Sequence, residues 1–162
     1  MKKQISVGDR IPSVTLARLA ADAIEEVALQ PFLADQRAVV VGIVGAFTPI
    51  CTTDHALEFI ASASRLRAMG YPTIVCIAPN DPWTLAAWQA SLGDTQGVQF
   101  LSDGNLDLAR ALGVTVVARE PRLGERPRRY LLLTRDNVIE RMTVEPDGTS
   151  VTCTAASAVE AA

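Results

Sequence analysis

Apolar residues along the chain follow two spacings, which separate the predicted strands from the predicted helices. Residues 38–44 and 73–78 form nearly continuous apolar or β-branched runs, which are typical of buried strands. Between these runs the apolar positions lie three or four residues apart, which predicts one face of a helix ending at Gly70. The residues of that face are Ala56, Phe59, Ile60, Ala63 and Leu66.

The second half of the chain continues the alternation of strands and helices. Asn80 and Asp81 are predicted to cap a second helix that begins at Pro82, ends near Leu92 and turns Trp88 inward. Further strands are predicted over 14–19, 25–29, 99–101, 114–118, 130–134 and 138–144, the last two as a hairpin. Short helices are predicted over 31–34, 105–112 and 152–161, and a loop rich in Pro and Arg over 119–128.

The order of these elements indicates the fold class. It is β-α-β-α, followed by an antiparallel hairpin and a helix, with no repeat or linker between them. At 162 residues the chain is predicted to form a single domain over residues 1–162. We therefore expect an α/β protein with a thioredoxin-like arrangement, in which a mixed β-sheet is flanked by helices.

Composition narrows the class of protein. With 49% hydrophobic residues, 20% charged residues and a net charge of −3, the chain is predicted to be globular and not to bind nucleic acid. No apolar run is long enough for a membrane span, and no signal peptide follows Lys2 and Lys3. Three cysteines are too few for a disulfide scaffold, and their spacing to the single histidine fits no metal site. We expect a cytoplasmic protein with working thiols.

The candidate chemistry lies where the first buried strand meets the long helix. Thr48 suits the N-cap and Pro49 the first helical position, so Cys51 falls in the first turn. Free backbone N–H groups and the helix dipole favour a thiolate there and lower the pKa of a cysteine. Since residue 54 is Asp54, there is no Cys-x-x-Cys motif, which argues against a thioredoxin-type disulfide oxidoreductase. A reactive lone thiolate suggests peroxide reduction or acyl transfer.

Three other side chains bear on this site. His55 follows Cys51 by four residues and is a possible base, but we favour a packing role because this spacing seldom brings the ring to an N-terminal sulfur. Cys76 lies inside an apolar strand and is predicted to be a core residue. Cys153 follows Thr152 at the predicted start of the last helix, where it is expected to be accessible and to have a lowered thiol pKa.

These residues resemble a known family. Residues 45–51, which read GAFTPIC, resemble with His55 and Phe59 the active-site segment of peroxiredoxins. The chain is most similar to the atypical two-cysteine, AhpC/TSA-related redoxins, a group that includes the plant type II enzymes. Residues 7–12, 80–88 and 144–153 fit the same family, so the resemblance spans most of the chain.

The resemblance implies a thiol-dependent peroxidase that reduces hydrogen peroxide and alkyl hydroperoxides without a cofactor or metal. Cys51 matches the peroxidatic cysteine, which becomes a sulfenic acid. Thr48 matches the threonine that contacts the peroxide oxygens. Arg129 matches the arginine that stabilises thiolate and transition state, with Arg128 as the fallback. One departure is Val44, which stands where the family motif has proline.

The resemblance also bears on the later steps and the partners. Cys153 matches the resolving cysteine of the atypical two-cysteine enzymes, whereas plant type II relatives have a cysteine at the position of Cys76. The implied partners are a hydroperoxide, a thiol reductant (thioredoxin, glutaredoxin or glutathione) and a second copy of the chain. The apolar helix ends near Phe47 and Trp88 are candidate contact surfaces for the second copy. The alternatives are a cysteine-dependent hydrolase or acyltransferase using His55, and a non-catalytic thioredoxin-like binding module.

Overall fold

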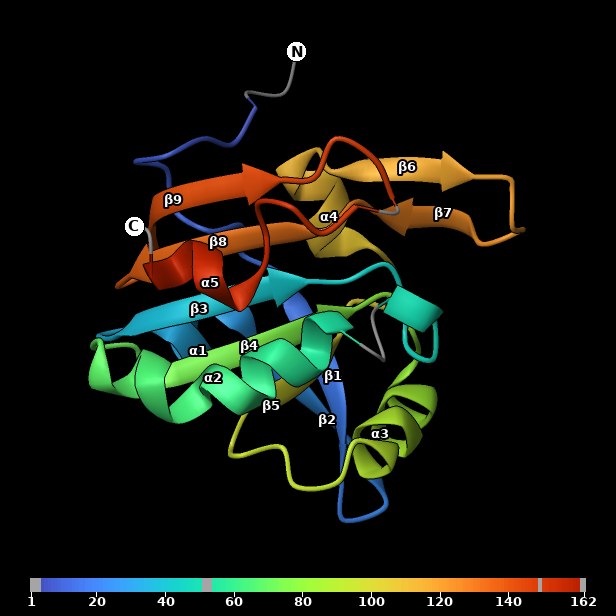
Figure 1. Cartoon of the computed structure of the whole chain (residues 1–162), viewed down its shortest axis with the longest axis horizontal. Coiled ribbons are helices and arrows are strands. Elements are labelled where there is room, and N and C mark those ends of the chain that lie inside the picture. Colours follow the sequence, from blue (N-terminus) through green and yellow to red (C-terminus); the bar gives the residue numbers. More distant parts are fainter. Residues whose placement is uncertain (1–3, 51–53, 149, 161–162) are drawn as a thin grey trace.

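A mixed sheet of seven strands runs through the molecule, with helices on both sides (Figure 1). The computed structural model describes residues 4–50, 54–148 and 150–160. The strand order is β2-β1-β5-β4-β3-β8-β9, in which β3, β4 and β5 are parallel and the other pairings antiparallel. The strands are β1 Thr15–Ala20, β2 Ala23–Ala28, β3 Arg37–Gly42, β4 Thr73–Ala78, β5 Gln99–Ser102, β8 Tyr130–Arg135 and β9 Val138–Val144.

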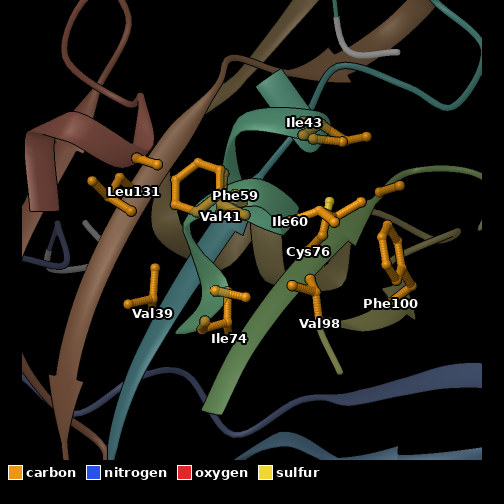
Figure 2. Close-up of a cluster of buried hydrophobic side chains, with 14 of the residues drawn as sticks. Val39, Val41, Ile43, Phe59, Ile60, Ile74, Cys76, Val98, Phe100 and Leu131 are labelled. Carbon is orange, nitrogen blue, oxygen red and sulfur yellow. The ribbon is translucent and has the colours of Figure 1, made fainter. Parts of the chain in front are cut away.

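The two faces of the sheet carry separate hydrophobic clusters. Successive strand residues face opposite sides, so Val39 and Val41 of β3 face one cluster and Val40 the other. The first cluster, part of which Figure 2 shows, is covered by α2 (Ala56–Ala68), α3 (Pro82–Ser91) and α5 (Ala156–Glu160). The second is covered by α1 (Leu29–Leu33) and α4 (Asp107–Leu112). These layers confirm the predicted α/β architecture.

Several elements lie where the sequence predicted them. Strand β4 has the predicted bounds, and β1 pairs antiparallel with β2 as a hairpin. Asp81 caps α3, since its carboxylate accepts hydrogen bonds from Thr84 N and Thr84 Oγ1, each at 2.8 Å. Pro82 occupies the first turn, as predicted. Within the described ranges, no helix has both the length and the apolar character that crossing a bilayer requires.

The predicted loop over 119–128 is wrong in its second half. Residues Gly124–Pro127 form strand β7, which pairs antiparallel with β6 (Thr115–Ala118) in a separate two-stranded sheet. The prediction rested on the Pro and Arg content of this segment. The pairing accommodates the proline because Pro127 is the last residue of its strand, opposite Thr115.

The predicted helix over 152–161 is also wrong at its start. The structure has α5 only from Ala156 to Glu160, after an irregular segment at 151–155. The backbone N–H groups of Thr152, Cys153 and Thr154 donate to the carboxylate of Glu145. A side chain from outside the predicted helix therefore satisfies these groups in a non-helical conformation, which delays the helix by one turn.

Candidate active site

The turn after β3 is tied to the loop between β4 and α3. Ala46 N donates to Asn80 Oδ1 at 2.7 Å, and within the turn Thr48 Oγ1 donates to Gly45 O at 2.7 Å. Thr48 directly precedes the helical residue Pro49, which is the place that an N-cap requires. The Thr48 hydroxyl is thus fixed to the turn, and the turn is fixed to the loop that carries Asn80.

Arg126 of β7 holds the same turn from the other side. Its Nη1 donates to Val44 O at 3.2 Å and its Nε to Leu123 O at 2.8 Å. The guanidinium packs so closely over Gly45 that a Cβ there would lie 2.7 Å from Nη1. The sequence analysis missed Arg126, because only the pairing of β7 with β6 brings this arginine to the turn. Val44 itself is buried, so this side of the turn is closed without the motif proline.

Cys51, the predicted nucleophile, lies outside the residues that the structure describes. Pro49 and Ile50 before it are helical, and Asp54 and His55 after it form a wider turn that leads into α2. The described residues nearest to Cys51 in sequence are thus those of the turn after β3, which we call the tied turn, and those at the start of α2.

His55 is a packed residue, as the sequence predicted. Its ring is fully buried and lies edge-on to Phe59, with ring centroids 5.6 Å apart. Its Nε2 lies 2.9 Å from Thr154 O, and because a carbonyl only accepts, Nε2 carries the proton. Burial lowers the pKa of His55, the charge of Arg129 lowers it further, and the bond to Thr154 opposes both. The neutral ring therefore links the start of α2 to the C-terminal segment.

Arg129 precedes β8 and lies inside the protein. Its side chain is only 2% exposed, and Nη1 donates to Gly148 O at 2.7 Å. Its backbone O accepts from Glu145 N at 2.9 Å. Arg128, the fallback, is only half-buried. The residue pattern alone indicated a charge at a strand end, whereas the fold places Arg129 close enough to His55 to affect its pKa.

The two described cysteines occupy different environments. Cys76 in β4 is buried in the first hydrophobic cluster with Val41 and Phe100, which confirms the predicted core position (Figure 2). Cys153 is partly exposed, and its Sγ donates weakly to Val144 O at 3.7 Å. Partial burial and the charge of Glu145 raise the pKa of the Cys153 thiol. The expectation of a lowered pKa at a helix start is wrong, because Cys153 precedes α5 by three residues.

Glu145 is the second residue that the sequence analysis missed. Its side chain is 0% exposed, and its carboxylate accepts hydrogen bonds from Thr152, Cys153 and Thr154. Burial alone would raise the pKa of this carboxyl, but the hydrogen bonds outweigh it and lower the pKa to about 2. The only signal in the sequence was an acidic residue before a Pro-Asp-Gly turn, which indicates the turn but not the contact.

Comparisons with known proteins identify the family. The Redoxin family matches residues 6–161. The chain is 39% identical over 162 residues to Peroxiredoxin-2E-2, chloroplastic, of Oryza sativa subsp. japonica, covering 97% of this chain and 72% of that protein. The chain belongs to the peroxiredoxin family. Peroxiredoxin-2C of the same plant is 33% identical, over 89% of this chain and 90% of that one. These matches confirm the resemblance to the plant type II peroxiredoxins.

A solved structure confirms the fold of this peroxiredoxin. The crystal structure of reduced Prx3 in complex with H2O2 from Vibrio vulnificus superposes with a TM-score of 0.91, at 25% identity, over 98% of each chain. The thioredoxin-like fold predicted from the order of elements is therefore correct. The relatives and this neighbour together identify the chain as a thiol-dependent peroxidase.

Proposed function

We propose that the chain reduces hydrogen peroxide and alkyl hydroperoxides at Cys51, with Thr48 and Arg129 as its catalytic partners. The observation that carries the proposal is the tied turn: Thr48 lies immediately before a helical residue, with its hydroxyl held by the turn. Cys51 follows Thr48 by three residues in the sequence. A buried arginine, Arg129, lies close enough to His55, the residue directly before α2, to lower its pKa.

In the first step the Cys51 thiolate attacks one oxygen of the peroxide. The S–O bond forms as the O–O bond breaks, so sulfur is oxidised to a sulfenic acid and the second oxygen leaves as hydroxide or alkoxide. The helix N-terminus and the charge of Arg129 favour the thiolate before the step and the departing anion during it. The Thr48 hydroxyl holds the peroxide in line with the sulfur.

In the second step Cys153 resolves the sulfenic acid. Its sulfur attacks the sulfenic sulfur, a disulfide forms, and the hydroxyl leaves as water with the proton of the thiol. Partial exposure supports Cys153 over Cys76, whose side chain is 2% exposed inside the sheet. A thiol reductant (thioredoxin, glutaredoxin or glutathione) then reduces the disulfide by thiol exchange.

The test is peroxide consumption with dithiothreitol as the reductant. We expect turnover in the wild type and in Cys76→Ser, and none in Cys51→Ser. Turnover in folded Cys51→Ser would overturn the proposal. The burial of His55 and the commitment of its Nε2–H to Thr154 speak against the hydrolase alternative. Peptide mapping after one equivalent of peroxide would identify the partner of Cys51, and a Cys51–Cys76 bridge would remove Cys153 from the mechanism.

The assembly and the location are proposals of their own. We propose a homodimer whose contact includes Phe47, which is exposed, as the sequence suggested. Trp88 itself is fully buried, as predicted for the inner face of its helix, and cannot make the contact. Trp83, 61% exposed at the start of α3, takes its place near the same turn. The cytoplasmic location inferred from the sequence stays a prediction.

A further inference from the structure

We propose that Arg126 is a positioning residue for Thr48. Its guanidinium holds the tied turn, residues 44–48, in the conformation that keeps the Thr48 side chain in place for a hydroperoxide. The inference rests on the proposed function, because it takes Thr48 as the side chain that binds the peroxide.

The tied turn has a backbone conformation that needs support. Phe47, directly before Thr48, has a φ of 59°, which lies in the left-handed region that a bulky residue rarely adopts. Such a conformation persists only where the surrounding structure holds it. The Phe47 side chain is 55% exposed, so its packing inside the chain supplies little of that support. Hydrogen bonds to the neighbouring residues of the turn must supply the rest.

Arg126 and Asn80 hold the backbone on either side of Gly45. Arg126 Nη1 donates to Val44 O at 3.2 Å, and Asn80 Oδ1 accepts from Ala46 N at 2.7 Å. The first of these bonds reaches the turn from β7, and the second reaches it from the loop after β4. The two bonds therefore fix consecutive peptide groups of the turn.

Arg126 and Thr48 also lie on the same side of Gly45. A Cβ added to Gly45 would lie 2.7 Å from Arg126 Nη1 and 3.4 Å from Thr48 Cγ2. The Thr48 hydroxyl donates to Gly45 O, and the guanidinium is fixed in turn because its Nε donates to Leu123 O at 2.8 Å. Loss of the guanidinium would free the carbonyl of Val44 and leave room beside the Thr48 side chain.

This arrangement should matter for one half of the catalytic cycle. A hydroxyl that orients a peroxide has to stay in place, because a displacement of about 1 Å can lower a rate by on the order of a hundredfold. Reduction of the oxidised enzyme by a thiol does not use the Thr48 hydroxyl. Arg126 should therefore affect the reaction with peroxide and spare the reaction with the thiol.

The experiment measures kcat/KM for hydrogen peroxide and, separately, for dithiothreitol. In Arg126→Ala we expect the value for peroxide to fall about tenfold and the value for dithiothreitol to stay within about twofold of the wild type. Arg126→Lys keeps a cationic donor for Val44 O, so its value for peroxide should recover to within about threefold of the wild type. Arg119→Ala is the matched control, because it removes an exposed arginine between β6 and β7, and it should change neither value.

A double-mutant cycle tests whether Arg126 acts through Thr48. Thr48→Val removes the hydroxyl and should itself lower kcat/KM for peroxide. Adding Arg126→Ala to Thr48→Val should then lower this value further by less than about twofold, because the group that Arg126 positions is already gone.

Gly45→Ala provides a second route to the same loss. Its Cβ would displace the guanidinium from the turn while the arginine remains in the chain. It should lower kcat/KM for peroxide and spare the value for dithiothreitol. This variant keeps the inference testable even where Arg126→Ala does not fold.

Several results would overturn the inference. They are a wild-type value for peroxide in folded Arg126→Ala or in Gly45→Ala, an equal loss of both values, no recovery in Arg126→Lys, an equal loss in Arg119→Ala, and a full further loss when Arg126→Ala is added to Thr48→Val. Wild-type activity in Thr48→Val would also overturn the role of Arg126, while leaving a peroxidase that depends on Cys51. Failure of the proposed function would look different, because the wild type would then consume no peroxide.

Discussion

Buried charges are the most informative single residues in this protein. A charged group inside a protein is costly unless hydrogen bonds and opposite dipoles compensate for the lost hydration. Arg129 donates to Gly148 O, and Glu145 accepts from three consecutive residues. Each charge is therefore held in a defined place. Both residues lie between the start of α2 and the segment that contains Cys153.

The first prediction concerns Arg129. In Arg129→Ala we expect the apparent pKa of Cys51, read from its alkylation rate against pH, to rise, and peroxide reduction to fall about a hundredfold. The reason is the loss of the buried cation that favours the thiolate and the leaving anion. Arg128→Ala, at the half-buried neighbour, should change neither quantity. An unshifted alkylation profile in folded Arg129→Ala would remove Arg129 from the site.

The second prediction concerns His55. In His55→Ala we expect peroxide consumption with dithiothreitol to stay within about tenfold of the wild type, because the ring packs and does not act as a base. The melting temperature should fall, since the substitution empties a fully buried position and breaks the bond to Thr154 O. Complete loss of turnover in a variant with a native circular dichroism spectrum would revive the Cys–His hydrolase alternative.

At the scale of elements, the segment between β9 and α5 is organised by side chains more than by its own backbone. Its N–H groups point to Glu145, and α5 begins only after them, at Ala156. The opposite case is α3, which carries its own signals: Asp81 as the cap and Pro82 in the first turn. Where the capping group is local, sequence predicts the boundary; where it is distant, tertiary contacts set it.

The third prediction follows from the pKa of Glu145. The folded value of about 2 lies below the ordinary carboxyl value, so ionised Glu145 stabilises the fold. This contribution is fully present above about pH 4.5 and is lost as the pH falls toward 2. From urea unfolding we expect the free energy of unfolding of the wild type to be about 2 kcal/mol larger than that of Glu145→Gln at pH 7. At pH 3 this difference should be smaller. A difference in free energy of unfolding that does not change with pH would contradict the lowered pKa of Glu145.

At the scale of the whole molecule, the sheet carries the site at the end of its central strands. β3 and β4 are parallel, so the turn after β3 and the loop after β4 meet at one edge, where Ala46 N bonds Asn80 Oδ1. The β6–β7 sheet lies against this edge through Arg126. Two exposed aromatic side chains, Phe47 and Trp83, lie near the same contact and belong to the surface that we propose for a second copy.

The fourth prediction tests that surface. By light scattering after gel filtration, we expect the wild type to have twice the 17.3 kDa mass of the chain, and Trp83→Glu to have the mass of the monomer. Val117→Glu is the matched control, because Val117 is 65% exposed on β6 and belongs to no proposed contact; it should remain dimeric. A monomeric wild type would contradict the dimer, and dissociation of Val117→Glu would contradict the choice of surface.

The sequence by itself determined the elements whose signals are local. The continuous apolar runs became the central strands β3 and β4, and the spacing of three and four became the buried face of α2. The residues of the active-site turn carried the family resemblance, which the comparisons confirmed. These features could be predicted because periodicity, caps and motifs are properties of neighbouring residues.

Only the tertiary structure decided which distant groups meet. It made β7 a strand by giving it β6 as a partner, and it delayed α5 by supplying Glu145 as the acceptor for 152–154. It also buried Arg129, which the residue pattern had placed at a strand end. The physical reason is the same each time: whether a polar or charged group is stable inside depends on partners outside its own element.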